Sequence, residues 1–357
     1  MLFGRENPHG GRSCDPEIAL DFSANTNPFG TPQRVKDAMA QALERVHQYP
    51  DPYCAALCSA IAQKEAVEQD FVLCGNGAAE LIYSYCEALH PACAVETAPT
   101  FSEYAAGLAR VGCRVERYLL KRENDFALGE DFLDFLQEKQ PEAIFLCNPN
   151  NPTGKTVERA LLLRVLDFCR ASGCALFVDE CFLDFTENGS SLKDVLWENP
   201  ALVILKAFTK SYGLAGVRLG YVLSSNYELL QRMSETVPPW NVSTLAQAAG
   251  VAALRETDFL KKTKQVISKE RGYLAEALRV LGLWVCEGEA NYLLFAGPVG
   301  LDTALRAQHI AVRSCANYEG LGAGWYRTAV RLHEENCALV EGIEKVLKEE
   351  TAWQKTL

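Results

Sequence analysis

The sequence has no long hydrophobic run, no excess of basic residues and no C-x-x-C cysteine pair. Its longest apolar stretches, such as 201–205, are far shorter than the roughly 18 residues that a membrane-spanning helix requires. Lysine and arginine number 35 against 46 aspartates and glutamates, which gives a net charge of −11. Nucleic-acid binding requires clustered basic residues, so we expect neither a nucleic-acid partner nor a membrane span.

The 14 cysteines are scattered along the chain, mostly inside apolar runs. Zinc sites need ligands at short, regular spacings, and no such spacing occurs. We therefore expect no metal and interpret the cysteines as buried thiols in the reducing cytoplasm. The first thirty residues contain several charged side chains and no apolar core segment, so we also expect no secretory signal.

The chain has 357 residues, of which 48% are hydrophobic and 23% charged. This composition is ordinary for a folded protein and excludes disorder and coiled coil. Short apolar runs alternate with helical periods from about residue 70 to residue 225. This alternation predicts an α/β fold in which helices cover both faces of a mostly parallel sheet.

The pattern changes after a pair of prolines at 238–239. Two long helical patterns, at about 243–255 and 258–281, precede further strands and a charged last helix at 334–349. The chain length favours one large or two coupled domains. We expect three parts: an N-terminal arm at 1–29 that belongs to the small domain, a large domain at 30–237, and a small α+β domain at 238–357.

Four unusual segments follow predicted strands of the large domain: 75–77, 148–154, 179–180 and 209–210. In open parallel sheets, ligands bind in the crevice at the carboxyl ends of the strands. The convergence of these segments on that edge predicts a ligand site there.

Each segment suggests a chemistry and has a simpler alternative. The glycines of 75–77 precede a predicted helix and could admit a phosphate, although an ordinary strand–helix turn would use the same glycines. Asp179 ends an apolar run and must meet a cation or several donors if it is buried, although it could instead be a capping residue at the surface. A lysine in an apolar pocket, as Lys210 could be, loses proton affinity and becomes an amine nucleophile able to form a Schiff base, although Lys210 taken alone could be a solvated lysine. The guanidinium group of Arg218 could bind an anion near Lys210.

The motifs N-N-P-T-G at 150–154, V-D-E at 178–180, T-K at 209–210 and L-A-G-V-R-L-G-Y at 214–221 resemble those of the fold-type I pyridoxal-phosphate enzymes of the class I/II aminotransferase superfamily. Their order and spacing match over nearly the whole chain. Two groups in this superfamily are similar, the threonine-phosphate decarboxylases of cobalamin biosynthesis and the histidinol-phosphate aminotransferases. H-G-G at 9–11, P-W-N-V at 239–242 and V-R-S-C-A-N-Y at 312–318 resemble the decarboxylases more closely.

The resemblance implies a three-layer α/β/α large domain and a role for each matching residue. Lys210 would carry pyridoxal 5'-phosphate as a Schiff base and later shuttle protons, and Asp179 would pair with the ring nitrogen. Asn151 would bind the ring hydroxyl, and Phe101 would stack on the ring. The remaining matches would hold the cofactor phosphate: Gly77, Ala78, Ala79, Thr209, Arg218 and, across the interface of a homodimer, Tyr49.

The resemblance also implies a substrate site at the subunit interface. Arg327 would bind the substrate carboxylate and Arg313 the substrate phosphate, and Asn25 is expected beside them. Arg331 lies four residues after Arg327, on the same face of a strand, so it could reach the same pocket or be a surface arginine. Phe182 replaces a tyrosine of the aminotransferases, which favours the decarboxylase group.

The implied activity is decarboxylation of O-phospho-L-threonine or O-phospho-L-serine to an aminoalkyl phosphate for corrinoid biosynthesis. The alternative is an aminotransferase acting on a phosphorylated substrate such as histidinol phosphate. A non-catalytic regulator would carry a DNA-binding domain before the cofactor domain, and we expect none because the family pattern begins near residue 9. A relative that binds the cofactor without turnover stays open, as does the choice between the two phospho-amino acids.

Overall fold

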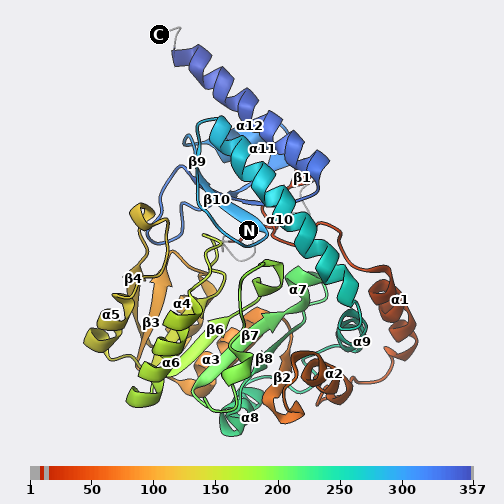
Figure 1. Cartoon of the computed structure of the whole chain (residues 1–357). Coiled ribbons are helices and arrows are strands. Elements are labelled where there is room, and N and C mark those ends of the chain that lie inside the picture. The colour runs from red at the N-terminus through yellow and green to blue at the C-terminus, as the bar shows by residue number, and fades with distance from the viewer. Residues whose placement is uncertain (1–8, 12–15, 355–357) are drawn as a thin grey trace.

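In the computed structural model, which describes residues 9–11 and 16–354, a seven-stranded sheet forms the centre of the molecule (Figure 1). Its strand order is β2-β8-β7-β6-β5-β3-β4, and all strands run parallel except β8. The seven strands are β2 (Val72–Gly75), β3 (Cys93–Ala98), β4 (Arg114–Leu119), β5 (Ala143–Cys147), β6 (Ala175–Asp179), β7 (Leu202–Ala207) and β8 (Gly220–Leu223). The predicted α/β class with a mostly parallel sheet is confirmed.

Helices cover both faces of this sheet because successive strand residues point to opposite sides. Phe145 and Phe177 belong to one buried core, whereas their neighbours Ile144 and Leu176 belong to another. The first core is closed by α3 (Ala78–Leu89), α4 (Glu103–Arg110) and α8 (Tyr227–Glu235). The second is closed by α2 (Ala55–Glu65), α5 (Phe132–Lys139), α6 (Arg159–Ser172) and α9 (Thr244–Ala253), with α1 (Gln33–Ala42) beside them.

The C-terminal part of the chain builds a separate antiparallel sheet of order β12-β13-β10-β9. Its strands are β9 (Trp284–Val285), β10 (Tyr292–Ala296), β12 (Arg313–Ser314) and β13 (Trp325–Ala329). The helices of this part are α10 (Thr257–Val280), α11 (Leu301–Arg306) and α12 (His333–Gln354), of which α10 and α12 lie side by side (Figure 1). The N-terminal strand β1 (Leu20–Asp21) pairs in parallel with β11 (Ile310–Ala311). The division into an arm, a large domain and a small domain stays a prediction.

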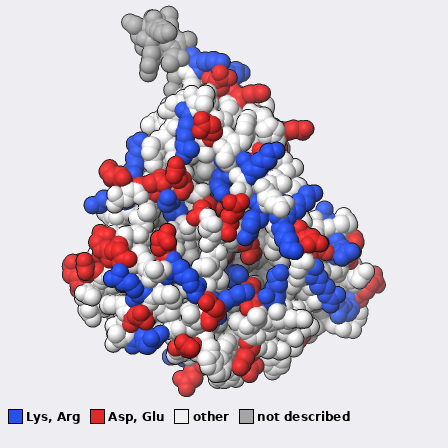
Figure 2. Space-filling view, viewed as in Figure 1, with Lys and Arg blue, Asp and Glu red and all other residues white. Residues whose placement is uncertain are grey.

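The elements expected from the sequence are present, with ends that differ by a few residues. The helix expected at 258–281 is α10, and the last helix expected at 334–349 is α12, which extends to Gln354. The surface in Figure 2 carries acidic and basic side chains interspersed with one another. None of the helices within residues 16–354 combines the length and apolarity that crossing a bilayer demands.

A buried ion-pair cluster ties α2 to the central sheet. Glu65, which is 6% exposed, accepts hydrogen bonds from Lys206 at 3.1 Å, Lys193 at 2.8 Å and the hydroxyl of Tyr221 at 2.7 Å. Burial alone would raise the pKa of Glu65, but Lys206 and Lys193 outweigh it and lower this pKa to about 2. The carboxylate therefore stays charged inside the protein.

We expect Glu65→Gln to lower the free energy of unfolding by about 3 kcal/mol, because removing one partner leaves the lysine charges uncompensated. Urea denaturation at neutral pH measures this loss, and Glu68→Gln, on the exposed surface, serves as the control. Because the folded pKa lies below the ordinary value of 4.5, the stabilisation is complete above that value and disappears as the pH falls toward about 2. Equal stability of Glu65→Gln and wild type at neutral pH would contradict the assignment.

Candidate functional site

A cavity of about 410 Å³ opens where strands of the central sheet end. The sheet's parallel strands direct their carboxyl ends to one edge, and β8 runs the other way, so the residues before β8 meet them there. Eleven of the predicted site residues line this cavity: Asn25, Ala78, Ala79, Phe101, Asn151, Asp179, Thr209, Lys210, Arg218, Arg313 and Arg327.

Three predicted residues do not line the cavity. Gly77 packs against the guanidinium of Arg218, which itself lines the cavity. Tyr49 is 80% exposed and stacks on Trp240, with the ring centres 4.6 Å apart. Arg331 forms an ion pair with Glu335 at 2.6 Å, so its guanidinium serves as a partner for α12.

Asp179 is the last residue of β6 and is almost completely buried. One carboxylate oxygen accepts a hydrogen bond from the hydroxyl of Tyr104 at 2.6 Å, and the other accepts one from the backbone N–H of Cys181 at 2.9 Å. Burial raises the pKa of Asp179, and these hydrogen bonds act in the opposite direction. Tyr104 was missed by the sequence analysis because its link to Asp179 joins residues 75 positions apart.

Lys210 lies in α7 (Phe208–Ser211), the single helical turn that follows β7. Burial lowers the pKa of this amine to about 8, and the nearby guanidinium groups of Arg327 and Arg218 act in the same direction. Its Nζ lies 5.8 Å from the ring centre of Phe182. A lysine of lowered pKa in an enclosed cavity is suited to nucleophilic attack on a carbonyl group.

The turn between β2 and α3 forms an anion-binding cradle. Gly77 has a φ of +87°, and a Cβ there would lie only 2.5 Å from Nη2 of Arg218, so this position requires glycine. α3 then begins at Ala78, which directs the unpaired N–H groups and the positive end of the helix dipole to the cavity. A phosphate group fits this combination of a helix start and an arginine.

The opposite wall of the cavity contains two arginines that the C-terminal sheet positions. Arg327, in β13, donates hydrogen bonds to the side chain of Asn151 and to the backbone oxygen of Ser23, while its buried Nε has no partner among the described residues. Both amide atoms of Asn25 are likewise buried without a partner among those residues. Arg313 donates to Asn317 at 2.7 Å. Buried polar atoms without partners are the groups that a bound ligand would satisfy.

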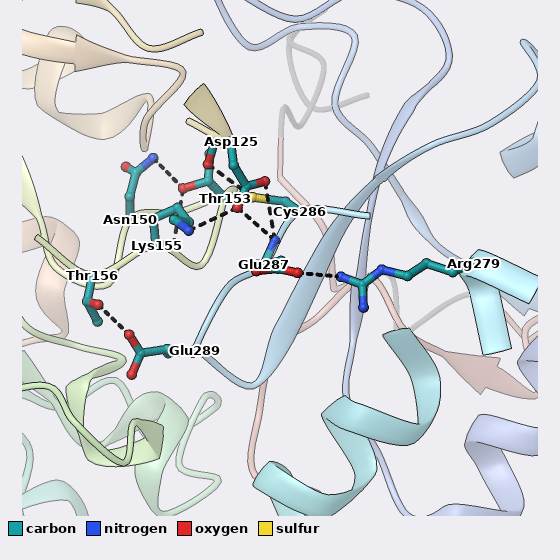
Figure 3. Close-up of polar contacts among 9 residues, drawn as sticks. All are labelled: Asp125, Asn150, Thr153, Lys155, Thr156, Arg279, Cys286, Glu287 and Glu289. Atoms are coloured by element: carbon teal, nitrogen blue, oxygen red, sulfur yellow. Dashed lines mark hydrogen bonds and ion pairs between the residues drawn. The ribbon is translucent and has the colours of Figure 1, made fainter. Parts of the chain in front are cut away.

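The loop at 148–154 is held in place by the C-terminal part of the chain (Figure 3). The backbone N–H of Glu289 donates to the oxygen of Gly154 at 2.7 Å, and the hydroxyl of Thr156 donates to the carboxylate of Glu289 at 2.5 Å. The carboxylate of Asp125 accepts a further hydrogen bond from Lys155, which follows the loop, at 2.9 Å. These contacts fix the loop that presents Asn151 to the cavity.

A second group that the sequence analysis did not assign lies at the cavity rim. His9 and Glu103 both line the cavity and are joined at 2.7 Å. The other carboxylate oxygen of Glu103 accepts from the hydroxyl of Tyr83 at 2.7 Å. The hydrogen bond with His9 is the largest contribution lowering the pKa of Glu103. His9 occurs in the H-G-G motif at 9–11, but nothing in the sequence indicated its partner.

The site thus combines a buried amine of lowered pKa, a buried carboxylate, an anion cradle and two arginines in one cavity. The amine can react with an aldehyde or ketone, and the carboxylate can hold a positively charged ring nitrogen. The cradle suits a phosphate, and the arginines suit a second anionic molecule.

The sequence pattern of the family described as "Aminotransferase class I and II" matches residues 17–343. The chain is 36% identical over 336 residues to a threonine-phosphate decarboxylase of Salmonella typhimurium, with 93% of this chain and 92% of that protein covered. It is 31% identical over 340 residues to a histidinol-phosphate aminotransferase of Cupriavidus pinatubonensis, with 92% and 88% covered.

The fold is also similar to that of solved structures. The histidinol-phosphate aminotransferase of Clostridium acetobutylicum superimposes with a TM-score of 0.86 at 25% identity, and the comparison covers 92% of this chain and 99% of that one. The comparisons therefore agree on one family and include both enzyme groups that the sequence motifs resemble.

We expect Lys210 to react with small carbonyl reagents before the exposed lysines do, because at a pH near its pKa of about 8 much of it is uncharged. Reductive methylation of cofactor-free protein with formaldehyde, followed by peptide mass mapping, measures the order of labelling. Lys206 is the matched control, since it is also buried but Asp184, Glu65 and Glu180 raise its pKa despite that burial. Labelling of Lys206 and Lys210 at equal rates would contradict the expected reactivity.

Proposed function

Because the chain belongs to the class I and II aminotransferase family, we propose that it is a pyridoxal-phosphate-dependent decarboxylase of a phosphorylated amino acid. The substrate is O-phospho-L-threonine or O-phospho-L-serine, and the product is an aminoalkyl phosphate for corrinoid biosynthesis. The observation that carries the proposal is the meeting of Lys210 and Asp179 with two arginines in one cavity. The similarity to a threonine-phosphate decarboxylase supports decarboxylation as the reaction.

Enzymes of this family use pyridoxal 5'-phosphate, and the residues of the cavity fit that group. Lys210 would bind its aldehyde carbon, Asp179 its ring nitrogen and Asn151 its ring hydroxyl. Its phosphate would lie in the cradle at the start of α3, beside Arg218. The bound cofactor supplies a conjugated ring that accepts the electron pair of the bond broken at Cα.

Asp179 has a defined electrostatic task in this proposal. Its pKa is raised by burial, and a positively charged ring nitrogen would compensate that desolvation cost. The hydroxyl of Tyr104 donates a hydrogen bond to one carboxylate oxygen, and the N–H of Cys181 donates one to the other. They orient the carboxylate and help to keep it ionised.

The two arginines would bind the two ends of the substrate. Arg327, 6% exposed, would form a bidentate contact with the carboxylate, and its Nε, which has no partner among the described residues, would provide a further donor. Arg313 would bind the phosphate, and the amide of Asn25, likewise without a partner in the described part of the chain, would contact the substrate between them. Arg331 has no place in this proposal because Glu335 holds its guanidinium.

Binding at both ends would decide which Cα bond is broken. The anchors at Arg327 and Arg313 would use remote binding energy to orient the bond at Cα that is to be broken. In decarboxylation that bond joins Cα to the carboxylate, and the amine of Lys210 would then return a proton to Cα. Phe182 lines the cavity, in the position where the sequence resemblance places a tyrosine in aminotransferases.

An aminotransferase acting on a phosphorylated substrate such as histidinol phosphate is the second candidate. It is favoured by the similarity to a histidinol-phosphate aminotransferase over 92% of this chain. The same anchors would serve it, with the Cα–H bond oriented for cleavage instead. The two functions therefore differ in the orientation of the substrate and share the residues of the cavity.

We further propose that the protein acts as a homodimer in which Tyr49 reaches the cofactor phosphate of the partner subunit. Tyr49 is 80% exposed and Trp240, against which it stacks, is 45% exposed. Tyr53, close by in the chain, is 83% exposed. Exposed aromatic side chains of this kind are typical of protein–protein interfaces.

We expect cofactor-loaded protein to release carbon dioxide from O-phospho-L-threonine or O-phospho-L-serine when no 2-oxo acid is present. Decarboxylation needs no amino-group acceptor, whereas transamination does, so this condition separates the two candidates. Trapped carbon dioxide is measured, and Lys210→Ala is the control that should abolish its release. Transfer of the amino group to an added 2-oxo acid, without release of carbon dioxide, would decide for the aminotransferase.

We expect sedimentation to give twice the chain mass of 39.4 kDa. Tyr49→Phe should keep that mass and weaken cofactor binding by roughly ten- to a hundredfold, because it removes one hydrogen bond to a charged phosphate. The matched change Tyr53→Phe should leave cofactor affinity unchanged. A monomer that binds the cofactor with full affinity would exclude a partner tyrosine at the phosphate.

A further inference from the structure

A second large cavity, of about 390 Å³, lies between α2, β2 and α8. Three cysteines line it: Cys54, Cys58 and Cys74. Their exposed fractions are 5%, 7% and 6%, so each thiol is largely buried yet borders the cavity. None of the cysteines within the described residues forms a disulfide, and the proposed reaction uses none of these three thiols.

The three thiols are brought together by two elements. Cys54 precedes α2 directly and Cys58 lies one turn later, so both face the same side of the helix. Cys74 lies in β2, and its sulfur is 3.7 Å from that of Cys58. The distance between the sulfur atoms in a disulfide is about 2.05 Å. The two sulfur atoms therefore need to approach each other only slightly, by rotation of the side chains, to form a bond.

The surroundings of the two thiols make Cys58 the more acidic of the pair. The hydrogen bond with Cys74 lowers the pKa of Cys58, although burial acts against it. The hydrogen bonds with Cys54 and Cys58, together with burial, hold the pKa of Cys74 well above its ordinary value. Cys58 is therefore the better thiolate, and the thiolate is the nucleophile in exchange with a disulfide.

We propose that Cys58 and Cys74 form a reversible intramolecular disulfide when the protein meets a small disulfide such as glutathione disulfide. The modification site itself does not require the proposed function, whereas its expected effect on cofactor affinity rests on that function. The cavity that Cys58 and Cys74 line would be the route by which the small disulfide reaches their sulfur atoms.

The step balances as two successive thiol–disulfide exchanges. The Cys58 thiolate attacks one sulfur of the small disulfide, which forms a mixed disulfide and releases one small thiol. Cys74 then attacks the sulfur of Cys58, loses its proton and releases the second small thiol. The protein loses two hydrogens and two electrons, and the small disulfide is reduced to two thiols.

The position of Cys74 links this modification to the anion cradle. Cys74 is followed directly by the turn at 75–77, and its strand pairs with β8, which follows Arg218. Drawing the sulfur of Cys74 toward α2 therefore pulls on the segment that positions Gly77 and the start of α3. We expect the oxidised protein to bind pyridoxal 5'-phosphate more weakly than the reduced protein and to recover its affinity on treatment with dithiothreitol.

The experiment treats the reduced, full-length, cofactor-free protein with glutathione disulfide. Remaining thiols are then alkylated, and peptides are mapped by mass spectrometry. We expect the loss of two of the fourteen thiols, a cross-link between the peptides of Cys58 and Cys74, and no retained glutathione. Free thiols at both positions, or glutathione retained on Cys58, would overturn the proposal.

Two variants provide matched controls. Cys58→Ser should keep all its remaining thiols under the same treatment, whereas Cys169→Ser should still lose two. Cys169 and Cys174 also share a hydrogen bond, but it raises the pKa of Cys169, and both are at most 1% exposed. A cross-link between Cys169 and Cys174 in the wild type would show that proximity alone governs oxidation and would overturn the assignment. Equal cofactor affinity before and after formation of the Cys58–Cys74 bond would overturn its link to the cradle.

Discussion

The desolvation of charge at one edge of the sheet is the constraint on which the rest of the site depends. Asp179 and Lys210 are brought out of water at the ends of neighbouring strands, and each loses part of its preference for the charged form. A charged group can stay buried only with compensating partners. The hydroxyl of Tyr104 and the N–H of Cys181 compensate Asp179 in part. What remains is a site whose electrostatics favour a bound molecule with a positive ring nitrogen and a reactive carbonyl group.

The large sheet and the location of the site could be predicted from the sequence because both follow from local patterns. Short apolar runs that end in 75–77, 148–154, Asp179 and Lys210 determine where strands stop, and parallel pairing then brings those ends together. The helices of residues 30–70 were not anticipated. α2 contains few charged residues, and alanines occupy its exposed positions 55 and 56, so the amphipathic pattern that marks a surface helix is weak.

The features of the site that could not be predicted from the sequence are contacts between residues far apart in the chain. Tyr104 binds Asp179, and His9 binds Glu103, across 75 and 94 positions of the chain. Nothing in the local pattern around Tyr104 distinguishes it from a tyrosine that merely fills the core. The position of Arg331 was equally open, because a strand face places it near Arg327 while the following helix offers Glu335 as a partner. The choice between those partners is made by tertiary packing.

Lys206 and Lys210 show how the same residue type receives opposite properties from its surroundings. They lie four residues apart, and burial favours the neutral form of both. Around Lys206 the carboxylates of Asp184, Glu65 and Glu180 outweigh burial and keep the amine protonated, so it joins α2 to the sheet. Around Lys210 two arginines add to the effect of burial, and Cys181 and Asp179 oppose it without outweighing it. The chain therefore places a charged, structural lysine and an amine of lowered pKa on consecutive elements, and the distribution of carboxylates around each lysine determines its pKa.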